Sequence, residues 1–312
     1  MDIMRFKMPE EEMPVEKQIL FFKEQFERFL SSKALADVLK ILGTDLKSLK
    51  PMYDGRKHKD GNVVETQLLE NRDDLEPFRE RLYPLLDELG FFRISKPLHA
   101  ENSRILILGG SLNTCFVRSR HAKTIINSST RSVDGLACYR PVNPVERKMS
   151  KYNSFADTEF GVLSDALAQV FGRSGQVYED DFQTNRNINS ISCIRTYPRS
   201  GDECGLHVFA APSSEPHIRR ADTADTIRFY LKHAELQPPE SLLFITSNRH
   251  CNRQFLQILN AMLASRAVIP FDIIGCTPDH LIVKKETYII FQFIQDLIGI
   301  IDWIERFQAE FC

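Results

Sequence analysis

The sequence predicts an α/β fold with a mainly parallel sheet, preceded by a helical N-terminal region. Two observations lead to this prediction. From Arg104 onward, short apolar runs of strand length alternate with amphipathic segments, a pattern typical of βαβ units. The first hundred residues instead carry apolar side chains at intervals of three and four, which is the period of a helix with one buried face.

The N-terminal region contains three predicted helices. Apolar residues recur at helical spacing over Val15–Leu30, and a second helix is expected at Lys33–Leu42, ending at Gly43. Glycine is common at this position because it adopts a left-handed backbone conformation without strain. A third helix is expected from about residue 75 to residue 89. The polar stretch Pro51–Asn62, with its Asp-Gly pairs, predicts an exposed loop.

The α/β region contains six apolar runs that predict strands. They are Arg104–Leu108, Val133–Cys138, Ile191–Thr196, Leu206–Ala210, Leu242–Thr246 and Val268–Ile274. Four segments with helical character lie between them: Phe116–Ile126, Phe160–Phe171, Thr223–His233 and Arg253–Ala264. Helices that alternate with parallel strands pack on the faces of the sheet, so we expect a Rossmann-like three-layer sandwich.

The C-terminal segment Tyr288–Phe307 is about as long as a membrane span. Polar residues interrupt it, and Asp296 in its middle would be costly in lipid. We therefore expect no membrane span, but a helix packed on the core or at a dimer interface, which leaves a homo-oligomer open. The expected organisation is a helical region at 1–100, an α/β domain at 101–286 and a C-terminal helix at 287–312.

Composition excludes several classes of protein. The 312 residues carry 40 Lys+Arg and 42 Asp+Glu, a formal charge of -2, which argues against non-specific nucleic-acid binding but not against a local basic pocket. Seven scattered cysteines without a CxxC pair predict neither a disulfide framework nor a zinc site, so no metal is expected. The N-terminus has no apolar signal-peptide core, and we expect a cytoplasmic protein.

Candidate ligand-binding residues follow the first predicted strand. They are Gly109, Gly110, Ser111, Asn113 and, on the next helix, Arg118. Glycines let the backbone approach a ligand closely, and a helix N-terminus attracts anions. An arginine one turn further on adds a bidentate contact to a phosphate or carboxylate. The alternative is an ordinary tight turn between strand and helix.

A second candidate cluster follows the predicted strand Leu242–Thr246. It consists of Thr246, Ser247, Arg249, His250 and Arg253. His250 is the candidate proton-transfer residue, because imidazole titrates near neutral pH. The alternative is a capped helix start with solvated arginines.

Two further acidic positions precede predicted helices. Glu159 is the candidate catalytic partner of His250, and Asp222 with Thr223 is a candidate binding pair. A carboxylate at such a position is also a common N-cap or a favourable charge at the helix N-terminus. That alternative stays open for all three residues.

In their order along the chain, these motifs resemble the DUF218 family of YdcF-, SanA- and ElyC-like proteins, over roughly residues 104–263. The matching pieces are the Gly109-Gly110 turn, the Arg118…Ala122 helix, Thr158-Glu159 in place of Ser-Glu, Asp222-Thr223 and Thr226 in place of Asn-Thr-x-x-Asn, and Thr-Ser-x-x-His-x-x-Arg at Thr246–Arg253. One departure is clear. The family's second strand ends in Ser-Gly-Gly, whereas this chain has Ala137-Cys-Tyr-Arg-Pro.

The resemblance implies an α/β protein with a polar pocket at the strand ends. The family includes a member that binds S-adenosylmethionine, and its reaction is largely undefined. We therefore expect a phosphorylated or nucleotide-like small molecule as ligand, with a hydrolase or transferase reaction as one hypothesis. The alternatives are a binding module without turnover and a protein-interaction module. No cofactor follows from the residues.

Overall fold

The computed structural model describes residues 3–55, 72–99, 102–174, 177–181, 187–199, 203–237, 239–276 and 290–312. The chain divides into two compact units. Unit 1 comprises Met1–Ser95, Asn248–Gln257 and Asp279–Cys312, and unit 2 comprises Lys96–Ser247 and Ile258–Pro278. The N-terminal helices and the C-terminal helix therefore belong to one unit, which also takes a short piece from the middle of the α/β region.

Unit 1 is helical. Its elements are α1 (Val15–Leu30), α2 (Lys33–Leu42), α3 (Leu46–Tyr53), a 3₁₀ helix at Asp73–Phe78, α4 (Arg79–Glu88), α10 (Ile290–Phe311) and the first half of α9 (Cys251–Ala264). The predicted bounds of α1 and α2 are confirmed, and Gly43 ends α2 with φ 65°. The loop predicted from Pro51 begins only after Tyr53, because α3 continues through that residue. Residues 56–62 of that loop lie outside the described residues.

Phenylalanine side chains form the core of unit 1. Phe26 packs edge-to-face on Phe307 of α10, with ring centroids 4.9 Å apart, and Phe22 contacts the same ring at 6.3 Å. Phe6, near the N-terminus, packs against Phe26 at 5.3 Å. The aromatic stripe of α1 is therefore buried within the unit. No helix among the described residues combines the length and the apolar character needed to cross a membrane.

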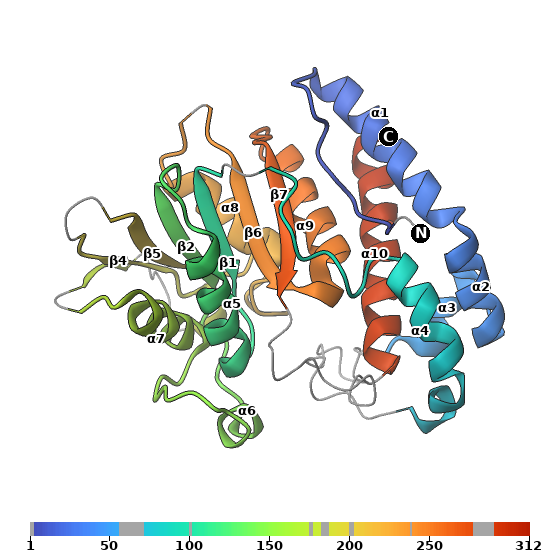
Figure 1. The fold of residues 1–312 in the computed structure, drawn as a ribbon, viewed down its shortest axis with the longest axis horizontal. Coiled ribbons are helices and arrows are strands. Elements are labelled where there is room, and N and C mark those ends of the chain that lie inside the picture. The colour runs from blue at the N-terminus through green and yellow to red at the C-terminus, as the bar shows by residue number, and fades with distance from the viewer. Residues whose placement is uncertain are drawn as a thin grey trace. The chain divides into compact units, whose positions relative to one another are not determined.

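Unit 2 contains the sheet (Figure 1). Its described strands are β1 (Arg104–Leu108), β2 (Ser132–Ala137), β3 (Tyr178–Asp181), β4 (Cys193–Tyr197), β5 (Gly205–Ala210), β6 (Leu242–Ser247) and β7 (Phe271–Cys276). They lie in the order β3-β4-β5-β2-β1-β6-β7. The strands from β5 to β7 are parallel, and β4 and β3 extend the sheet antiparallel. The prediction of an α/β fold with a mainly parallel sheet is confirmed, although β3 was not predicted.

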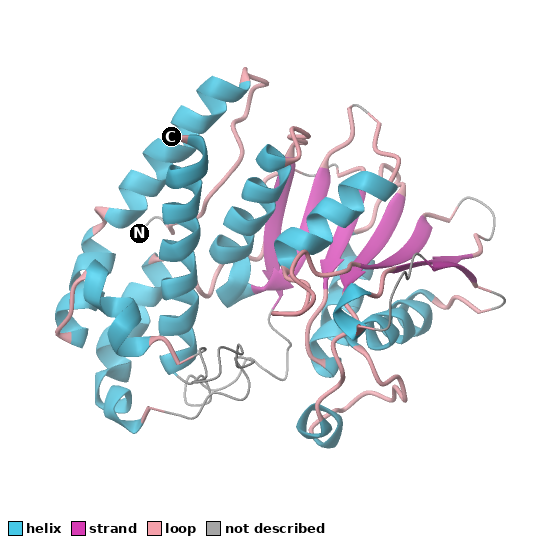
Figure 2. Ribbon diagram, turned by 180° about the vertical axis from the view of Figure 1, so that it is seen from behind, coloured by secondary structure: helices cyan, strands magenta, loops and turns pink. Residues whose placement is uncertain are grey.

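Helices cover both faces of the sheet in unit 2. The helices of this unit are α5 (Leu112–Ile125), α6 (Pro144–Lys148), α7 (Glu159–Phe171), α8 (Thr223–His233) and the second half of α9, and all but α6 lie on a face of the sheet (Figures 1 and 2). The views from the two sides place α5 and α7 together on one face and α8 on the other (Figures 1 and 2). Helix α6, which was not predicted, lies beyond the carboxyl ends of the parallel strands.

The register of the central strands brings their carboxyl ends together. Leu108 at the end of β1 pairs with Leu136 of β2, and Ile107 pairs with Ile245 of β6 on the other side. The segments that follow β1, β2 and β6 therefore start at the same edge of the sheet. In a parallel sheet this edge is where loops and helix N-termini converge.

Gly135 in the middle of β2 gives a test of the packing between the sheet and α7. A Cβ atom at Gly135 would lie 2.8 Å from Leu163 and 3.1 Å from Leu167. We expect Gly135→Val to lower the free energy of unfolding by roughly 1–3 kcal/mol, because the core is overpacked. Adding Leu163→Ala makes room and should recover part of the loss in urea unfolding. If the two substitutions each lower the free energy of unfolding and their losses simply add in the double variant, this packing is wrong.

Candidate functional site

The candidate site in unit 2 is built around the turn that follows β1. Gly109 donates its backbone N–H to the carbonyl of Leu136, 2.7 Å away, so the turn stays attached to β2. A Cβ atom at Gly109 would lie 2.1 Å from Oε1 of Glu159. Only glycine leaves room for this carboxylate, which begins α7. The structure thus brings two predicted site residues, Gly109 and Glu159, into direct contact.

Arg118 on α5 reaches back to the same turn. The residue is 2% exposed, and its Nη1 donates to the carbonyl of Gly109 at 2.6 Å. Its Nη2 donates to Oγ of Ser247, at the end of β6, at 3.0 Å. A single guanidinium therefore joins the ends of β1 and β6, and it brings together three of the predicted site residues.

Arg140, three residues beyond β2, is the centre of a buried ion-pair cluster that the sequence did not predict. Its Nε donates to Glu159 at 2.9 Å, its Nη1 to Glu146 at 2.6 Å, and its Nη2 to the carbonyl of Gly110 at 2.9 Å. Burial by itself would lower the pKa of Arg140, but the charges of Glu159 and Glu146 outweigh it and hold the pKa above its ordinary value. The guanidinium therefore stays charged.

Glu146 of α6 occupies the position that the sequence assigned to a ligand anion. Its Oε2 accepts a hydrogen bond from the backbone N–H of Leu112, the first residue of α5, at 3.2 Å. The same carboxylate pairs with Arg140 and is 8% exposed. A negative charge at a helix N-terminus is favourable, and here the chain itself supplies it.

Ser111 and Asn113, at the start of α5, form hydrogen bonds within the protein. The hydroxyl of Ser111 lies 2.7 Å from that of Thr114. Asn113 donates through Nδ2 to the carbonyl of Met149 at 3.1 Å and accepts from the backbone N–H of Lys151 at 3.0 Å. Asn113 therefore binds the chain that follows α6. Its predicted role in ligand binding stays a prediction.

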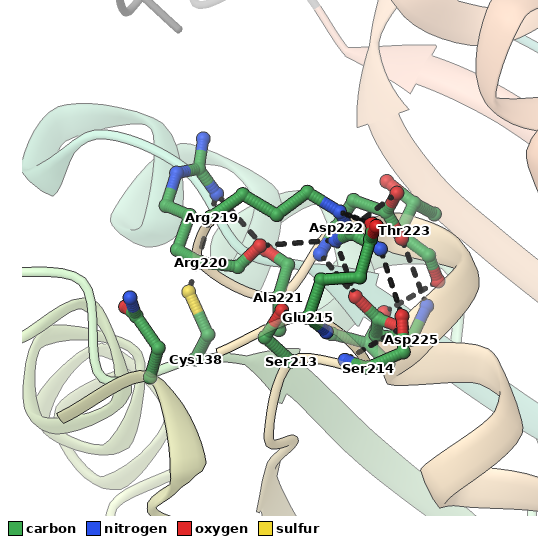
Figure 3. Close-up of polar contacts among 12 residues, drawn as sticks. Cys138, Ser213, Ser214, Glu215, Arg219, Arg220, Ala221, Asp222, Thr223 and Asp225 are labelled. Atoms are coloured by element: carbon green, nitrogen blue, oxygen red, sulfur yellow. Dashed lines mark hydrogen bonds and ion pairs between the residues drawn. The ribbon is translucent and has the colours of Figure 1, made fainter. Parts of the chain in front are cut away.

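Asp222 is the N-cap of α8. It accepts from the N–H of Asp225, whose carboxylate in turn accepts from the N–H of Asp222, and together they form a capping box (Figure 3). Arg219 pairs with Asp225 at 2.6 Å and stabilises the loop before α8. Thr223, the predicted neighbour, is the first residue of the helix. Asp222 thus has a structural role here, and the binding role of Asp222 and Thr223 stays a prediction.

Arg220 points toward the end of β2. Its Nη1 lies 4.0 Å from Sγ of Cys138, the residue directly after β2 (Figure 3). Burial raises the pKa of the Cys138 thiol to about 11, with a further contribution from the charge of Glu159. The thiol is therefore protonated at neutral pH. Arg220 adds a third arginine to the edge of the sheet formed by Gly109, Gly110 and Cys138.

The predicted motif Thr246–Arg253 is divided between the units, because the boundary falls after Ser247. Thr246 is fully buried at the end of β6 in unit 2. Ser247 also belongs to unit 2, whereas Arg249, His250 and Arg253 belong to unit 1, where they surround Asp296 of α10. The nearest approaches to Asp296 are 2.8 Å from Arg253, 3.1 Å from His250 and 3.6 Å from Arg249.

His250 is held by hydrogen bonds at both ring nitrogens. Nε of Arg249 donates to Nε2 at 3.3 Å, so the proton of the neutral ring lies on Nδ1 and is donated to Asp296 at 3.1 Å. Burial lowers the pKa of His250 to about 3, although the Asp296 charge opposes this shift. In this arrangement the imidazole is neutral at pH 7, and its side chain is 14% exposed.

Several residues of these clusters were not predicted to be site residues, although two of them carry a signal in the sequence. Asp296 stands out as a carboxylate in the middle of an apolar helix, and such a residue needs a buried partner. Asn143-Pro144 before Glu146 is a helix-start signal, confirmed by the cap that Asn143 places on α6. Arg140 and Arg220 left no signal, because arginines in polar loops are ordinarily solvated.

The pH dependence of stability tests the arrangement at His250. Its folded pKa lies below the unfolded value of about 6.5, so the unfolded state takes up the proton first as the pH falls. We expect the free energy of unfolding to fall below pH 6.5 by up to about 1.4 kcal/mol per pH unit from this group. His250→Gln should remove this contribution in urea unfolding at pH 7 and pH 5.

Fluorescence of Trp303, the single tryptophan of the chain and a residue of α10, reports the unfolding of unit 1. His217→Gln, at an exposed position of unit 2, is the control. If the free energies of unfolding of His250→Gln and His217→Gln depend on pH in the same way, the assignment of a neutral imidazole to His250 is wrong.

Comparison with other proteins does not add to this geometry. No family model, curated protein or solved structure matches the chain. Among the described residues, no group of three or more His, Cys, Asp or Glu side chains is arranged to hold a metal ion.

Proposed function

We propose that unit 2 is a Rossmann-like, DUF218-related domain that binds a small phosphorylated or nucleotide-like anion at the carboxyl ends of β1 and β2. One observation carries the proposal. Two buried arginines from different segments, Arg118 and Arg140, donate to the carbonyls of the neighbouring residues Gly109 and Gly110. The turn after β1 is thereby flanked by guanidinium groups, the donors best suited to phosphate and carboxylate oxygens.

The topology of the sheet supports this position. From β1 the chain proceeds outward to β2 and β5, whereas β6 and β7 lie on the opposite side of β1. The connections therefore reverse direction between β1 and β6, and ligands of open parallel sheets bind at such a switch point. Arg118 lies at this point, since it hydrogen-bonds both Gly109 after β1 and Ser247 at the end of β6.

The charge of the cluster favours an anion. Arg118, Arg140 and Arg220 contribute three positive charges at the strand ends, against the two carboxylates Glu146 and Glu159. A positive balance in a buried cluster attracts phosphate more strongly than the same charges would in water. S-adenosylmethionine, which presents a carboxylate and a nucleoside, is a second ligand to test on the strength of the family resemblance.

Binding without turnover is the version of the function that these groups favour. The thiols at the site are Cys138 and Cys115, and burial raises their pKa to about 11 and about 12. Neither is a thiolate at neutral pH, which is the form needed for nucleophilic attack. The alternative is a hydrolase or transferase with Glu159 as proton-transfer group; His250, its predicted partner, belongs to unit 1. This alternative is tested by searching for product with mass spectrometry after incubation with each ligand that binds.

Thermal-shift titration tests the proposal. The ligands are inorganic phosphate, a nucleoside monophosphate, a sugar phosphate and S-adenosylmethionine. At least one of them should raise the melting temperature of the wild type. Arg220→Gln should weaken the binding of that ligand about tenfold or more, because a charge-assisted hydrogen bond is lost. Arg228→Gln removes the same charge from α8, where Arg228 pairs with Asp225, and is the matched control.

Two outcomes would overturn the proposal. One is that none of these ligands stabilises the wild type. The other is that Arg220→Gln and Arg228→Gln reduce the shift equally, which would leave only a general effect of protein charge.

A further inference from the structure

The segment from Pro141 to Asp157, which we name the strap, contains α6 and places Glu146 at the site. The structure describes all of its residues, and only Glu146 and Ser154 among them are buried. In its second half, Tyr152 stacks on Phe116 of α5 with ring centroids 4.6 Å apart, and Ala156 packs against the core. Around Glu146, by contrast, the apolar side chains of Val145 and Met149 are 52% and 69% exposed. Unlike the helices on the sheet, α6 therefore gains little stability from burial of apolar surface.

Polar contacts hold the strap in place. At its base, the backbone N–H of Val142 donates to the carbonyl of Asp157 at 2.8 Å. Arg147 binds within the strap, to the carbonyls of Ser154 at 3.0 Å and Ala156 at 2.8 Å. Asn113 binds the backbone beyond α6, as described above. Glu146 is the strap's charged contact with the buried cluster at Arg140.

We propose that Glu146 is an internal competitor for the ligand anion, and that the ligand displaces it from Arg140 and from the N-terminus of α5. This proposal rests on the proposed function, because it names how access to the same site is controlled. The carboxylate of Glu146 makes the contacts that a bound oxyanion would make: two guanidinium nitrogens of Arg140, at 2.6 Å and 3.3 Å, and the N–H of Leu112 at 3.2 Å.

The cluster can lose Glu146 without leaving a buried charge unpaired. Arg140 keeps its ion pair with Glu159 through Nε, on the side of the guanidinium away from Glu146. Glu159 is itself fixed, because its backbone N–H donates to the carbonyl of Arg140 at 2.8 Å. Glu146 regains water when it leaves. Opening the strap at α6 thus exposes little apolar surface, and segments of this kind open at low free-energy cost.

Displacement raises the positive charge that the ligand meets. With Glu146 withdrawn, Arg118, Arg140 and Arg220 face the single carboxylate of Glu159. A phosphate dianion gains more from this field than a monocarboxylate does, so the competition selects for phosphate. The apparent Kd for phosphate equals the intrinsic Kd divided by the fraction of open molecules, so that a closed strap weakens binding.

The experiment compares wild type, Glu146→Gln and Asp157→Asn by calorimetric titration with inorganic phosphate. Glu146→Gln keeps the shape of the side chain but removes its charge. We expect it to lower the Kd for phosphate roughly tenfold, because more molecules are open. Asp157→Asn removes one charge from the same strap at a position whose side chain is 95% exposed, and it should leave the Kd unchanged.

Hydrogen exchange supplies a readout that needs no ligand. In Glu146→Gln, the amides of α6 and the residue that follows it, 144–149, should exchange faster than in wild type, while those of β1 and β2 stay equally protected. The same measurement confirms that the variant is folded. In the wild type, saturating phosphate should also accelerate exchange in the strap, because the ligand replaces Glu146.

The outcomes separate this proposal from the proposed function. Tighter phosphate binding by Glu146→Gln, together with faster exchange of the strap, supports both. If wild type and Glu146→Gln bind phosphate equally, the internal competitor is wrong and the binding function stands. A third outcome is that none of the three proteins binds phosphate, but the wild type binds another ligand of the thermal-shift series. If the strap stays protected from hydrogen exchange in that complex, the displacement of Glu146 is also wrong. If no protein binds any of these ligands, both proposals fail.

Discussion

The carboxylate of Glu159 lies against the backbone of Gly109, and much of the architecture of unit 2 at the strand ends depends on this contact. A side chain at Gly109 would displace the carboxylate. From its place at the start of α7, Glu159 holds the guanidinium of Arg140, which binds the carbonyl of Gly110 and the carboxylate of Glu146. One absent Cβ atom thereby permits an ion-pair cluster that joins β1, β2, α6 and α7.

Each unit contains a buried ion-pair cluster, and the sign of the central charge differs between the two clusters. In unit 2 a single guanidinium, that of Arg140, is shared between two carboxylates, whereas in unit 1 the carboxylate of Asp296 is shared among two arginines and His250. Breaking such a group by removing one partner leaves an uncompensated buried charge, which is costly. The cluster around Arg140 differs in one respect. One of its carboxylates, that of Glu146, comes from α6, a short helix whose apolar side chains are largely exposed, and it can leave.

The regular elements were predictable from local pattern, whereas the irregular ones were not. The bounds of α1, α2 and α8 follow from apolar spacing and caps that lie within each segment. Strand β3, with the sequence Tyr-Glu-Asp-Asp, has no apolar alternation, and it exists because β4 offers an edge to pair with. One boundary between the units falls after Gln257, inside the continuous helical pattern of α9, where no local signal marks it.

The sequence by itself determined the α/β class, the helical N-terminal region and the turn at Gly109-Gly110, because these depend on periodicity and on residues close together in the chain. Only the tertiary structure decided which charges meet. It placed Arg140 and Glu146 where a ligand anion was expected, and it grouped His250 with Asp296 of α10. Ion pairs between residues distant in sequence depend on how the elements pack, and no local pattern encodes that information.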